Sequence, residues 1–241
     1  MVHANSADQA PWTAEGQEKR AAVQSMFAEI APTYDLCNAL MSLSLHKRWR
    51  AWAARRLELK PGSKTLDMCS GTGDFLKPLR RAVGVEGMVI GADFCLPMLE
   101  RATDKGASGL LLADAGRIPL AAGAFDAVSV GWGIRNVPDV DLAHQEIARV
   151  LVSGGRFVSL DMARPQNHLV RSYSEWAFNH LVPILGALFR KRKAYTYLPK
   201  STASFKSREE LKASMLRAGF AEVGWKDFFF GNICVHWGTK R

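Results

Sequence analysis

The chain has 241 residues, 48% of them hydrophobic, which is enough to bury the core of one large domain or of one domain with an insertion. No apolar run reaches the roughly 20 residues of a membrane-spanning helix, and the N-terminal stretch lacks the basic start and apolar centre of a signal peptide. Its four cysteines are scattered without a C-x-x-C pair, which argues against a disulfide scaffold and against a metal site.

Positive charge is concentrated in the last third of the chain. Residues 168–241 hold 13 Lys and Arg against 5 Asp and Glu, a net charge of +8, whereas the whole chain carries +9. The run RKRK at residues 190–193 leads this excess. Local basicity of this kind suits an anionic surface, either lipid or nucleic acid, or it is only a solvated face.

The apolar pattern divides the chain into segments of different periodicity. The expected segments are a polar tail at 1–18, a helical segment at 19–60, an alternating core at 61–165, an aromatic and basic helical insertion at 166–205, and a closing helix with a strand hairpin at 206–241. Ser207 and Glu210 form a capping pattern that predicts where the closing helix begins.

Within the alternating core, short apolar runs are followed by helical stretches, as in KTLDMC before FLKPLRRAV. This alternation predicts a parallel sheet with helices on both faces. The chain ends on two strand-like runs, AEVGWKDFFF and NICVHWGTK, with no helix between them. A hairpin there makes the last strand antiparallel, so we expect an α/β fold with a mostly parallel sheet.

The first strand of this sheet runs into a glycine-rich turn, where ligands of such sheets bind. A dinucleotide fingerprint needs a third glycine where Leu76 stands, and a phosphate loop needs a lysine that the turn lacks. Asp67 and Asp74 flank Gly71 and Gly73, and two carboxylates favour a cation over a pyrophosphate. S-adenosylmethionine fits, because it carries a sulfonium and an ammonium and no phosphate.

Acidic residues also follow the next two strands. Asp93 comes twenty residues after Gly73, where a carboxylate can accept hydrogen bonds from both ribose hydroxyls. Asp114 and Ala115 end the third strand, at a position where the protein could recognise the amino group of adenine. The alternative is that these aspartates are turn residues or helix caps. Three successive strand ends with this character favour a nucleoside site.

Two motifs resemble those of the C-methyltransferases of ubiquinone and menaquinone biosynthesis. The first is APTYDLCNALMSLSLHKRW, which carries the family's spaced residues Tyr34, Asp35, Asn38, Ser42, His46 and Trp49. The second is GWGIRNVPD, with Gly133, Arg135, Asn136 and Val137. The resemblance covers roughly residues 20–241. The chain departs from the family at Cys69 and Ser70, where the family commonly has Gly-Gly.

The resemblance implies a class I S-adenosylmethionine-dependent methyltransferase fold, Rossmann-like, with a mostly parallel seven-stranded sheet and an antiparallel last strand. In it, 19–60 becomes a substrate and lid segment, 61–165 the cofactor-binding core and 166–205 a cover over the substrate site. The cofactor contacts that it implies are Thr72, Asp93, Asp114, Ala115 and Gly131.

The chemistry expected from this family is methyl transfer to a ring carbon of a quinol whose hydroxyl has ionised. His46 is the most natural base by its pKa. Arg135 would stabilise the developing oxyanion, Asn136 would orient it and Tyr34 would donate a hydrogen bond. Each has a structural alternative: Tyr34 as a lid residue, His46 bonded to a helix end, and Arg135 with Asn136 fixing a loop.

The expected acceptor is a polyprenyl quinol, foremost demethylmenaquinol. A benzoquinol, another phenolic or polyketide acceptor, and a non-catalytic place in a quinone-biosynthesis assembly stay open. Nucleic acid is disfavoured, because neither a basic core face nor an added binding module is visible.

Residues 176–197 combine apolar, aromatic and basic side chains that suit an anionic membrane surface, with a lid over the substrate as the alternative. We expect a cytoplasmic protein, with peripheral attachment to the inner membrane face also open. A homodimer is compatible with the sequence.

Overall fold

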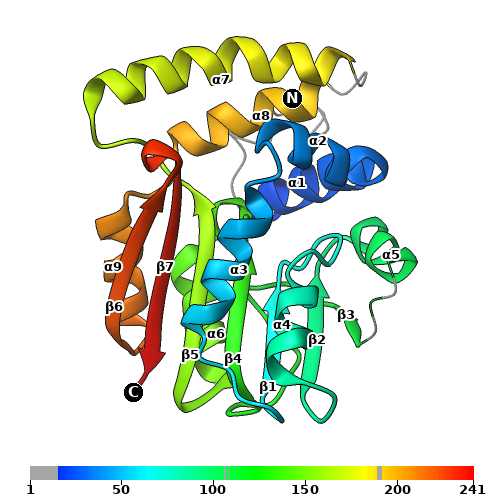
Figure 1. Cartoon of the computed structure of the whole chain (residues 1–241), viewed down its shortest axis with the longest axis vertical. Helices are drawn as coiled ribbons and strands as arrows, with labels where there is room; N and C mark the ends of the chain where they lie inside the picture. Colours follow the sequence, from blue (N-terminus) through cyan, green and yellow to red (C-terminus); the bar gives the residue numbers. More distant parts are fainter. Residues whose placement is uncertain (1–15, 106, 108, 189–191) are drawn as a thin grey trace, which may run out of the picture.

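The computed structural model describes residues 16–105, 107, 109–188 and 192–241 (Figure 1), and it leaves out the side chains of 181–188 and 192–195. Most of the tail expected at 1–18 therefore lies outside the described residues. So do residues 190 and 191 of the basic run 190–193, the side chains of 192 and 193, and the other side chains in the middle of the stretch 176–197.

One sheet of seven strands forms the centre of the described chain, in the order β3-β2-β1-β4-β5-β7-β6. The strands are β1 (Lys64–Met68), β2 (Met88–Asp93), β3 (Leu110–Leu112), β4 (Phe125–Gly131), β5 (Leu151–Met162), β6 (Phe220–Phe228) and β7 (Ile233–Lys240). Strands β1 to β5 pair in parallel, and β7 runs antiparallel to both β5 and β6. The predicted mostly parallel sheet with an antiparallel last strand is confirmed.

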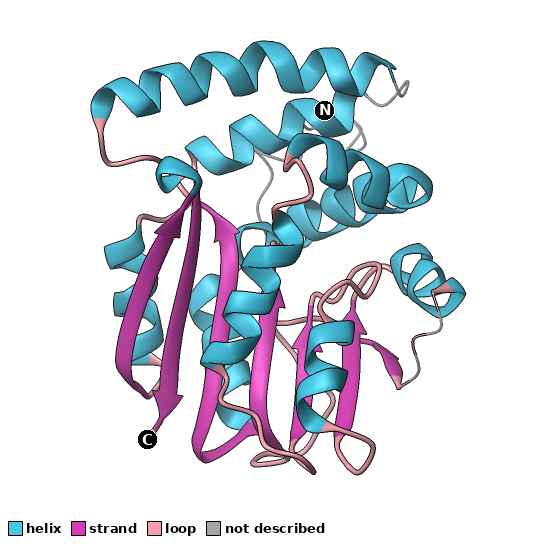
Figure 2. Ribbon diagram, viewed as in Figure 1, coloured by secondary structure: helices cyan, strands magenta, loops and turns pink. Residues whose placement is uncertain are grey.

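Helices cover both faces of this sheet (Figure 2). On the near face lie α3 (His46–Arg56) and α4 (Leu76–Val83), and on the far face lie α6 (Val140–Val150) and α9 (Arg208–Arg217). Strand β4 shows why two cores form, because successive side chains point to opposite faces. Ala127 packs with the α3 and α4 residues, and Val128 packs with those of α6 and α9.

Local signals fix where two of these helices begin. Asp139 caps α6 by accepting a 3.0 Å hydrogen bond from the Leu142 backbone N–H. Ser207 and Glu210 form the predicted capping box of α9, with each side chain bonded to the other residue's backbone N–H. The glycine turn after β1 takes positive φ at Gly71 and Gly73, which glycine adopts without strain.

A second layer of helices lies beyond the carboxyl ends of the parallel strands (Figure 1). It consists of α1 (Gly16–Ile30), the 3-10 turn η1 (Ala31–Thr33), α2 (Tyr34–Met41), α7 (His168–Leu188) and α8 (Arg192–Ala203). Cys37 of α2 packs against Phe178 and Leu198, which joins the N-terminal helices to α7 and α8. Helix α5 (Leu96–Asp104) lies below α1 and contacts it. Within the described residues, no helix is both long and apolar enough to cross a membrane.

Candidate active site

A pocket lies over the carboxyl ends of β1, β2 and β4, where the strand order reverses and ligands of such sheets bind. Five of the predicted cofactor residues line it, and they come from the ends of β2, β3 and β4 and from the glycine turn after β1: Gly71, Asp93, Asp114, Ala115 and Gly131. The fold thus brings together residues that are up to 60 positions apart in the chain.

Asp93 is held in place by backbone donors. Its two carboxylate oxygens accept hydrogen bonds from the backbone N–H of Gly71 at 2.8 Å and of Cys95 at 2.9 Å. Burial raises the pKa of Asp93 to about 6, and these N–H groups act in the opposite direction. The carboxylate is therefore oriented before a ligand binds.

Asp67 is buried beneath the same turn. Its Oδ1 accepts a 2.6 Å hydrogen bond from Ser129, but its Oδ2 has no partner in the described chain. Burial raises the pKa of Asp67 to about 7. The Ser70 hydroxyl is also buried without a partner. Because buried polar groups are nearly always hydrogen-bonded, this pair fits a polar ligand such as the amino-acid end of S-adenosylmethionine.

Two further predicted cofactor residues are placed differently. The Thr72 hydroxyl donates a 2.5 Å hydrogen bond to Asp35 of α2, so it is engaged by the protein. Gly73 allows a close approach between the turn and α5, because a Cβ there would lie 3.1 Å from the Ala102 Cβ. Neither of them lines the pocket, and neither does Asp67, so a contact from any of the three to the cofactor stays a prediction.

Helix α1 closes this pocket from above. Arg20 pairs with Asp114 at 2.5 Å, and Gln24 donates a 2.7 Å hydrogen bond to the Phe94 carbonyl. Lys19 donates to the Val137 carbonyl at 3.0 Å. The helix therefore contacts the segments that follow β2, β3 and β4 and covers the predicted nucleoside site.

A second, largely apolar pocket adjoins the first. Its lining comes from α1, α2, α3, α7, α8, from the 3-10 turns η2 (Ile134–Asn136) and η3 (Phe229–Gly231), and from the ends of β5 and β7. It includes Met26, Ile30, Met41, Trp49, Met162, Phe178, Leu198 and Ile233. Phe27, Tyr34 and Trp132 line both pockets. These three rings form an aromatic wall between a site suited to a nucleoside and a site suited to an apolar ring.

Trp132 has an unusual backbone within this wall. Its φ is +58°, a conformation that a bulky residue rarely adopts and that often occurs at functional sites. The residue follows the last position of β4, and its side chain stacks 4.5 Å below the guanidinium of Arg50. The strained turn thus presents the ring between the two pockets.

His46 lines the apolar pocket, as its predicted role requires. Ser42 donates its single proton to the Asn38 carbonyl at 2.6 Å and lies 2.5 Å from His46 Nδ1. The Nδ1–H of a neutral ring is then the donor to Ser42, which leaves Nε2 as the basic nitrogen. Burial, together with the charge of Arg50, lowers the pKa of His46 to about 4, so the ring is neutral at physiological pH.

Arg135 also lines the apolar pocket, but its charge has a partner. Its guanidinium is hydrogen-bonded to the Asp161 carboxylate, and both side chains are buried. Asn136 accepts a 3.0 Å hydrogen bond from Tyr197 and donates one of 2.9 Å to the Trp132 carbonyl. Both residues therefore stabilise the strand-four loop, which was the structural alternative for them.

Sequence reasoning missed three residues of this site: Arg50, Trp132 and Tyr197. Arg50 directly follows Trp49 of the first motif, and Trp132 stands inside the second, so their positions were a signal. Tyr197 was grouped with the interfacial aromatics of 176–197. Its burial under α1 and its bond to Asn136 depend on contacts between distant segments.

Comparison with known proteins gives matches along almost the whole chain. Residues 14–240 match the model of the ubiE/COQ5 methyltransferase family. A demethylmenaquinone methyltransferase of Desulfitobacterium hafniense (strain Y51) is 38% identical over 233 residues, covering 93% of this chain and 92% of that protein. One from Lactiplantibacillus plantarum is 37% identical over 227 residues, covering 91% of this chain and 96% of that protein.

Solved structures share the fold. A SAM-dependent methyltransferase from Thermotoga maritima superimposes with a TM-score of 0.64 at 24% identity, covering 90% of this chain and 99% of that one. Another from Aquifex aeolicus gives a TM-score of 0.56 at 18% identity, covering 78% of this chain and 87% of that one. The methyltransferase fold expected from the motifs is confirmed.

Proposed function

The chain belongs to the ubiE/COQ5 methyltransferase family and is an S-adenosylmethionine-dependent methyltransferase, and from this premise we propose that its acceptor is a demethylmenaquinol. The observation that carries the proposal is the aromatic wall of Phe27, Tyr34 and Trp132 between a nucleoside pocket and an apolar pocket. The names of the relatives in Desulfitobacterium hafniense and Lactiplantibacillus plantarum support a naphthoquinol over a benzoquinol.

Methyl transfer to carbon requires alignment and the exclusion of water. Bound S-adenosylmethionine supplies an electrophilic methyl group. The protein has to hold the acceptor carbon about 3–3.5 Å from that methyl group, in line with the bond that breaks. Phe27, Tyr34 and Trp132 stand where the two pockets meet, and α1 covers them, so this region is suited to exclude water.

The quinol carbon becomes nucleophilic when the neighbouring hydroxyl ionises, and a phenol has a pKa near 10. We assign the hydroxyl proton to Nε2 of His46, the basic nitrogen of a neutral ring in the acceptor pocket. When the methyl group has moved from sulfur to the ring carbon, that carbon releases its own hydrogen as a proton, and the ring becomes aromatic again. The low pKa of His46 makes the transfer of the hydroxyl proton uphill, so the oxyanion needs stabilisation. Burial raises the pKa of Tyr34, which keeps its proton and can donate a hydrogen bond to that oxyanion.

Arg135 and Asn136 contribute at longer range. Arg135 lies in the acceptor pocket with Tyr34, so its charge favours a nearby oxyanion even though Asp161 offsets part of it. Asn136 holds the Trp132 carbonyl and Tyr197, and thereby fixes the aromatic wall. The cofactor contacts assigned with these roles are Asp67, Gly71, Thr72, Gly73, Asp93, Asp114, Ala115 and Gly131.

A polyprenyl tail keeps such a quinol in the bilayer, so we place the protein in the cytoplasm and in peripheral contact with anionic lipid. Three large apolar or aromatic side chains of α7 support this: Leu169 is 79% exposed, Tyr173 68% and Trp176 53%. Aromatic side chains with a polar tip favour the membrane interface. The contact assigned to 176–197 extends into side chains outside the described residues, and a homodimer is part of the same proposal.

The test is to incubate the purified protein with methyl-labelled S-adenosylmethionine and a short-chain demethylmenaquinone, with and without dithionite. Label on the naphthoquinol ring only under reduction supports the proposal, because the electron-poor quinone has no nucleophilic carbon. Transfer to a benzoquinol and not to the naphthoquinol would move the acceptor to the ubiquinone pathway. Transfer to neither, with cofactor binding intact, would overturn the quinol assignment.

A further inference from the structure

Arg50 is a buried guanidinium that the protein leaves incompletely paired. Only 6% of the residue is exposed, and its Nη1 has no hydrogen-bond partner among the described residues. The nearest carboxylate oxygen, Oδ2 of Asp74, is 3.4 Å away and makes a charge contact without a hydrogen bond. A buried charged donor without a hydrogen-bond partner destabilises the folded protein unless a ligand supplies that partner.

The other arginines that line the two pockets are already matched. Arg20 is hydrogen-bonded to Asp114, and Arg135 is hydrogen-bonded to Asp161. The Nε of Arg135 also lacks a partner among the described residues, but a buried carboxylate offsets part of its charge. Among the described arginines of the site, Arg50 therefore has the least compensated charge.

Arg50 lines the apolar pocket, on the side where that pocket meets Gly131 of the cofactor pocket. Asp93 ends β2 and Asp114 follows β3, and the sheet order β3-β2-β1-β4 runs from them toward Gly131 at the end of β4. The Nε of Arg50 is 3.9 Å from the position that a Cβ on Gly131 would take. A ligand whose nucleoside lies at Asp93 therefore extends along the strand ends toward Arg50.

The groups at this end have the charges of a receptor for an amino acid. Asp67 Oδ2, Ser70 Oγ and Arg50 Nη1 are all buried without partners. Arg50 is close enough to Asp67 to act on its carboxylate electrostatically. The ammonium group of an amino acid would pair with the Asp67 carboxylate. Its α-carboxylate would pair with the Arg50 guanidinium, because arginine is the favoured partner of a carboxylate.

We propose that Arg50 binds the α-carboxylate of the methionyl group of S-adenosylmethionine, with Asp67 binding its ammonium group. Arg50 comes from α3, outside the glycine turn and the strand ends, so the N-terminal segment supplies part of the cofactor site. The guanidinium carbon of Arg50 lies 4.5 Å from the centroid of the Trp132 ring, a cation–π contact that helps to hold the charged group in place. This inference rests on the methyltransferase activity and holds whichever acceptor is methylated.

The test compares S-adenosylmethionine with its decarboxylated form, which keeps the sulfonium and the ammonium and lacks only the carboxylate. Calorimetric titration without an acceptor gives both affinities. We expect the unmodified protein to bind S-adenosylmethionine about 10- to 100-fold tighter than the decarboxylated form, the range of a charge-assisted hydrogen bond. Arg50→Met abolishes this preference by weakening only the carboxylated ligand, and Arg50→Lys, a point charge in place of a planar fork, retains part of it.

Arg56→Met is the matched control. Arg56 lies on the same helix and stacks on another tryptophan, with its guanidinium 4.2 Å from the Trp237 ring centroid. It lines neither pocket, so this variant keeps the full preference for the carboxylated ligand.

Two results would overturn the assignment. Equal weakening of both ligands by Arg50→Met and by Arg50→Lys would mean that Arg50 only packs the site. Unchanged affinities with a lower turnover number would place its action on the acceptor oxyanion. Neither result would affect the identity of the acceptor, which the dithionite experiment tests separately.

Discussion

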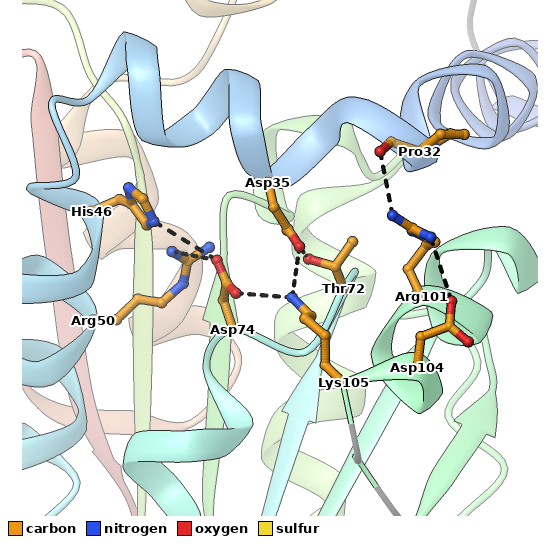
Figure 3. Close-up of polar contacts among 9 residues, drawn as sticks. All are labelled: Pro32, Asp35, His46, Arg50, Thr72, Asp74, Arg101, Asp104 and Lys105. Carbon is orange, nitrogen blue, oxygen red and sulfur yellow. Dashed lines mark hydrogen bonds and ion pairs between the residues drawn. The ribbon is translucent and has the colours of Figure 1, made fainter.

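The hydroxyl of Thr72 donates a 2.5 Å hydrogen bond to Oδ1 of Asp35, and so joins the glycine turn to helix α2 (Figure 3). Oδ2 of Asp35 accepts a 2.9 Å bond from Lys105, which also bonds Asp74 at 3.0 Å. These four residues, the α2 latch, connect three segments: the N-terminal helices, the turn and the end of α5. The latch therefore holds the cover of the cofactor pocket in place.

Lys105→Met should loosen this cover. The Lys105 side chain is 29% exposed, so each of its two ion pairs contributes no more than about 0.5–1 kcal/mol. We expect a few-fold loss of affinity for S-adenosylhomocysteine and faster amide exchange in α1 and α2. Arg101→Met is the control, because Arg101 makes only 3.4 Å contacts with Asp104 and the Pro32 carbonyl. Unchanged exchange in Lys105→Met would show that packing alone holds the helices.

The buried pair of Arg135 and Asp161 should separate stability from catalysis. Removing one partner leaves an uncompensated buried charge, so Asp161→Asn should lower the free energy of unfolding by about 3–5 kcal/mol. The double variant Arg135→Met with Asp161→Leu should regain part of that loss, because two apolar side chains need no partner, whereas the backbone N–H groups of Arg135 and Met162 lose the carboxylate that accepts their hydrogen bonds. Activity should stay low in the double variant if the charge of Arg135 favours the oxyanion.

Denaturant unfolding and initial rates would check this. The exposed pair of Arg217 and Asp141, 2.6 Å apart, is the reference, and Asp141→Asn should change stability by less than about 1 kcal/mol. Full activity in a stable double variant would leave Arg135 a structural role only.

Cofactor affinity should fall as the pH is lowered from 8 to 5. Burial raises the pKa of Asp67 to about 7 and that of Asp93 to about 6 in the free protein. Both carboxylates take up a proton in this range. Protonated Asp67 no longer attracts an ammonium group, and protonated Asp93 no longer accepts hydrogen bonds from both ribose hydroxyls. Calorimetry of S-adenosylhomocysteine should show up to about tenfold weaker binding per pH unit for each proton involved.

Asp67→Asn should bind more weakly at pH 8 and show a flatter profile between pH 6 and 8. The effect of pH on protein stability has the opposite sign. A carboxyl group whose pKa is higher in the folded than in the unfolded state stabilises the folded free protein as the pH falls from 7 toward 4. A pH-dependent loss of affinity therefore cannot come from acid unfolding at these two groups. A profile that Asp67→Asn leaves unchanged would remove Asp67 from the ammonium site.

The features that could be predicted from the sequence are those set by residues close together in the chain. The sheet follows from runs such as KTLDMC, whose apolar period is read directly, and the capping box follows from Ser207 and Glu210, three positions apart. The strand-end residues Asp93 and Asp114 meet because parallel strands share one edge. The bond from Thr72 to Asp35 spans 37 positions and depends on how the N-terminal helices dock, which no local pattern encodes.

The same limit applies to Cys69, where the sequence showed a departure from the family's glycine but not its consequence. Cys69 has a φ of +58°, which strains any residue other than glycine. A Cβ on Gly133 would lie 2.4 Å from the Cys69 Cβ and 2.7 Å from its Sγ. The cysteine is thus accommodated only because position 133 has no side chain.

Cys69→Gly should therefore raise the free energy of unfolding by about 1 kcal/mol, seen as a higher melting temperature. Gly133→Ala should lower it by about 1–3 kcal/mol in the unmodified protein and by clearly less in the Cys69→Gly background, where the two closest atoms are gone. The Gly131→Ala loss should be the same in both backgrounds, since a Cβ there meets Phe75 at 3.0 Å. Equal Gly133→Ala losses in both backgrounds would mean that neighbours other than Cys69, such as Val130 at 2.9 Å, set the limit.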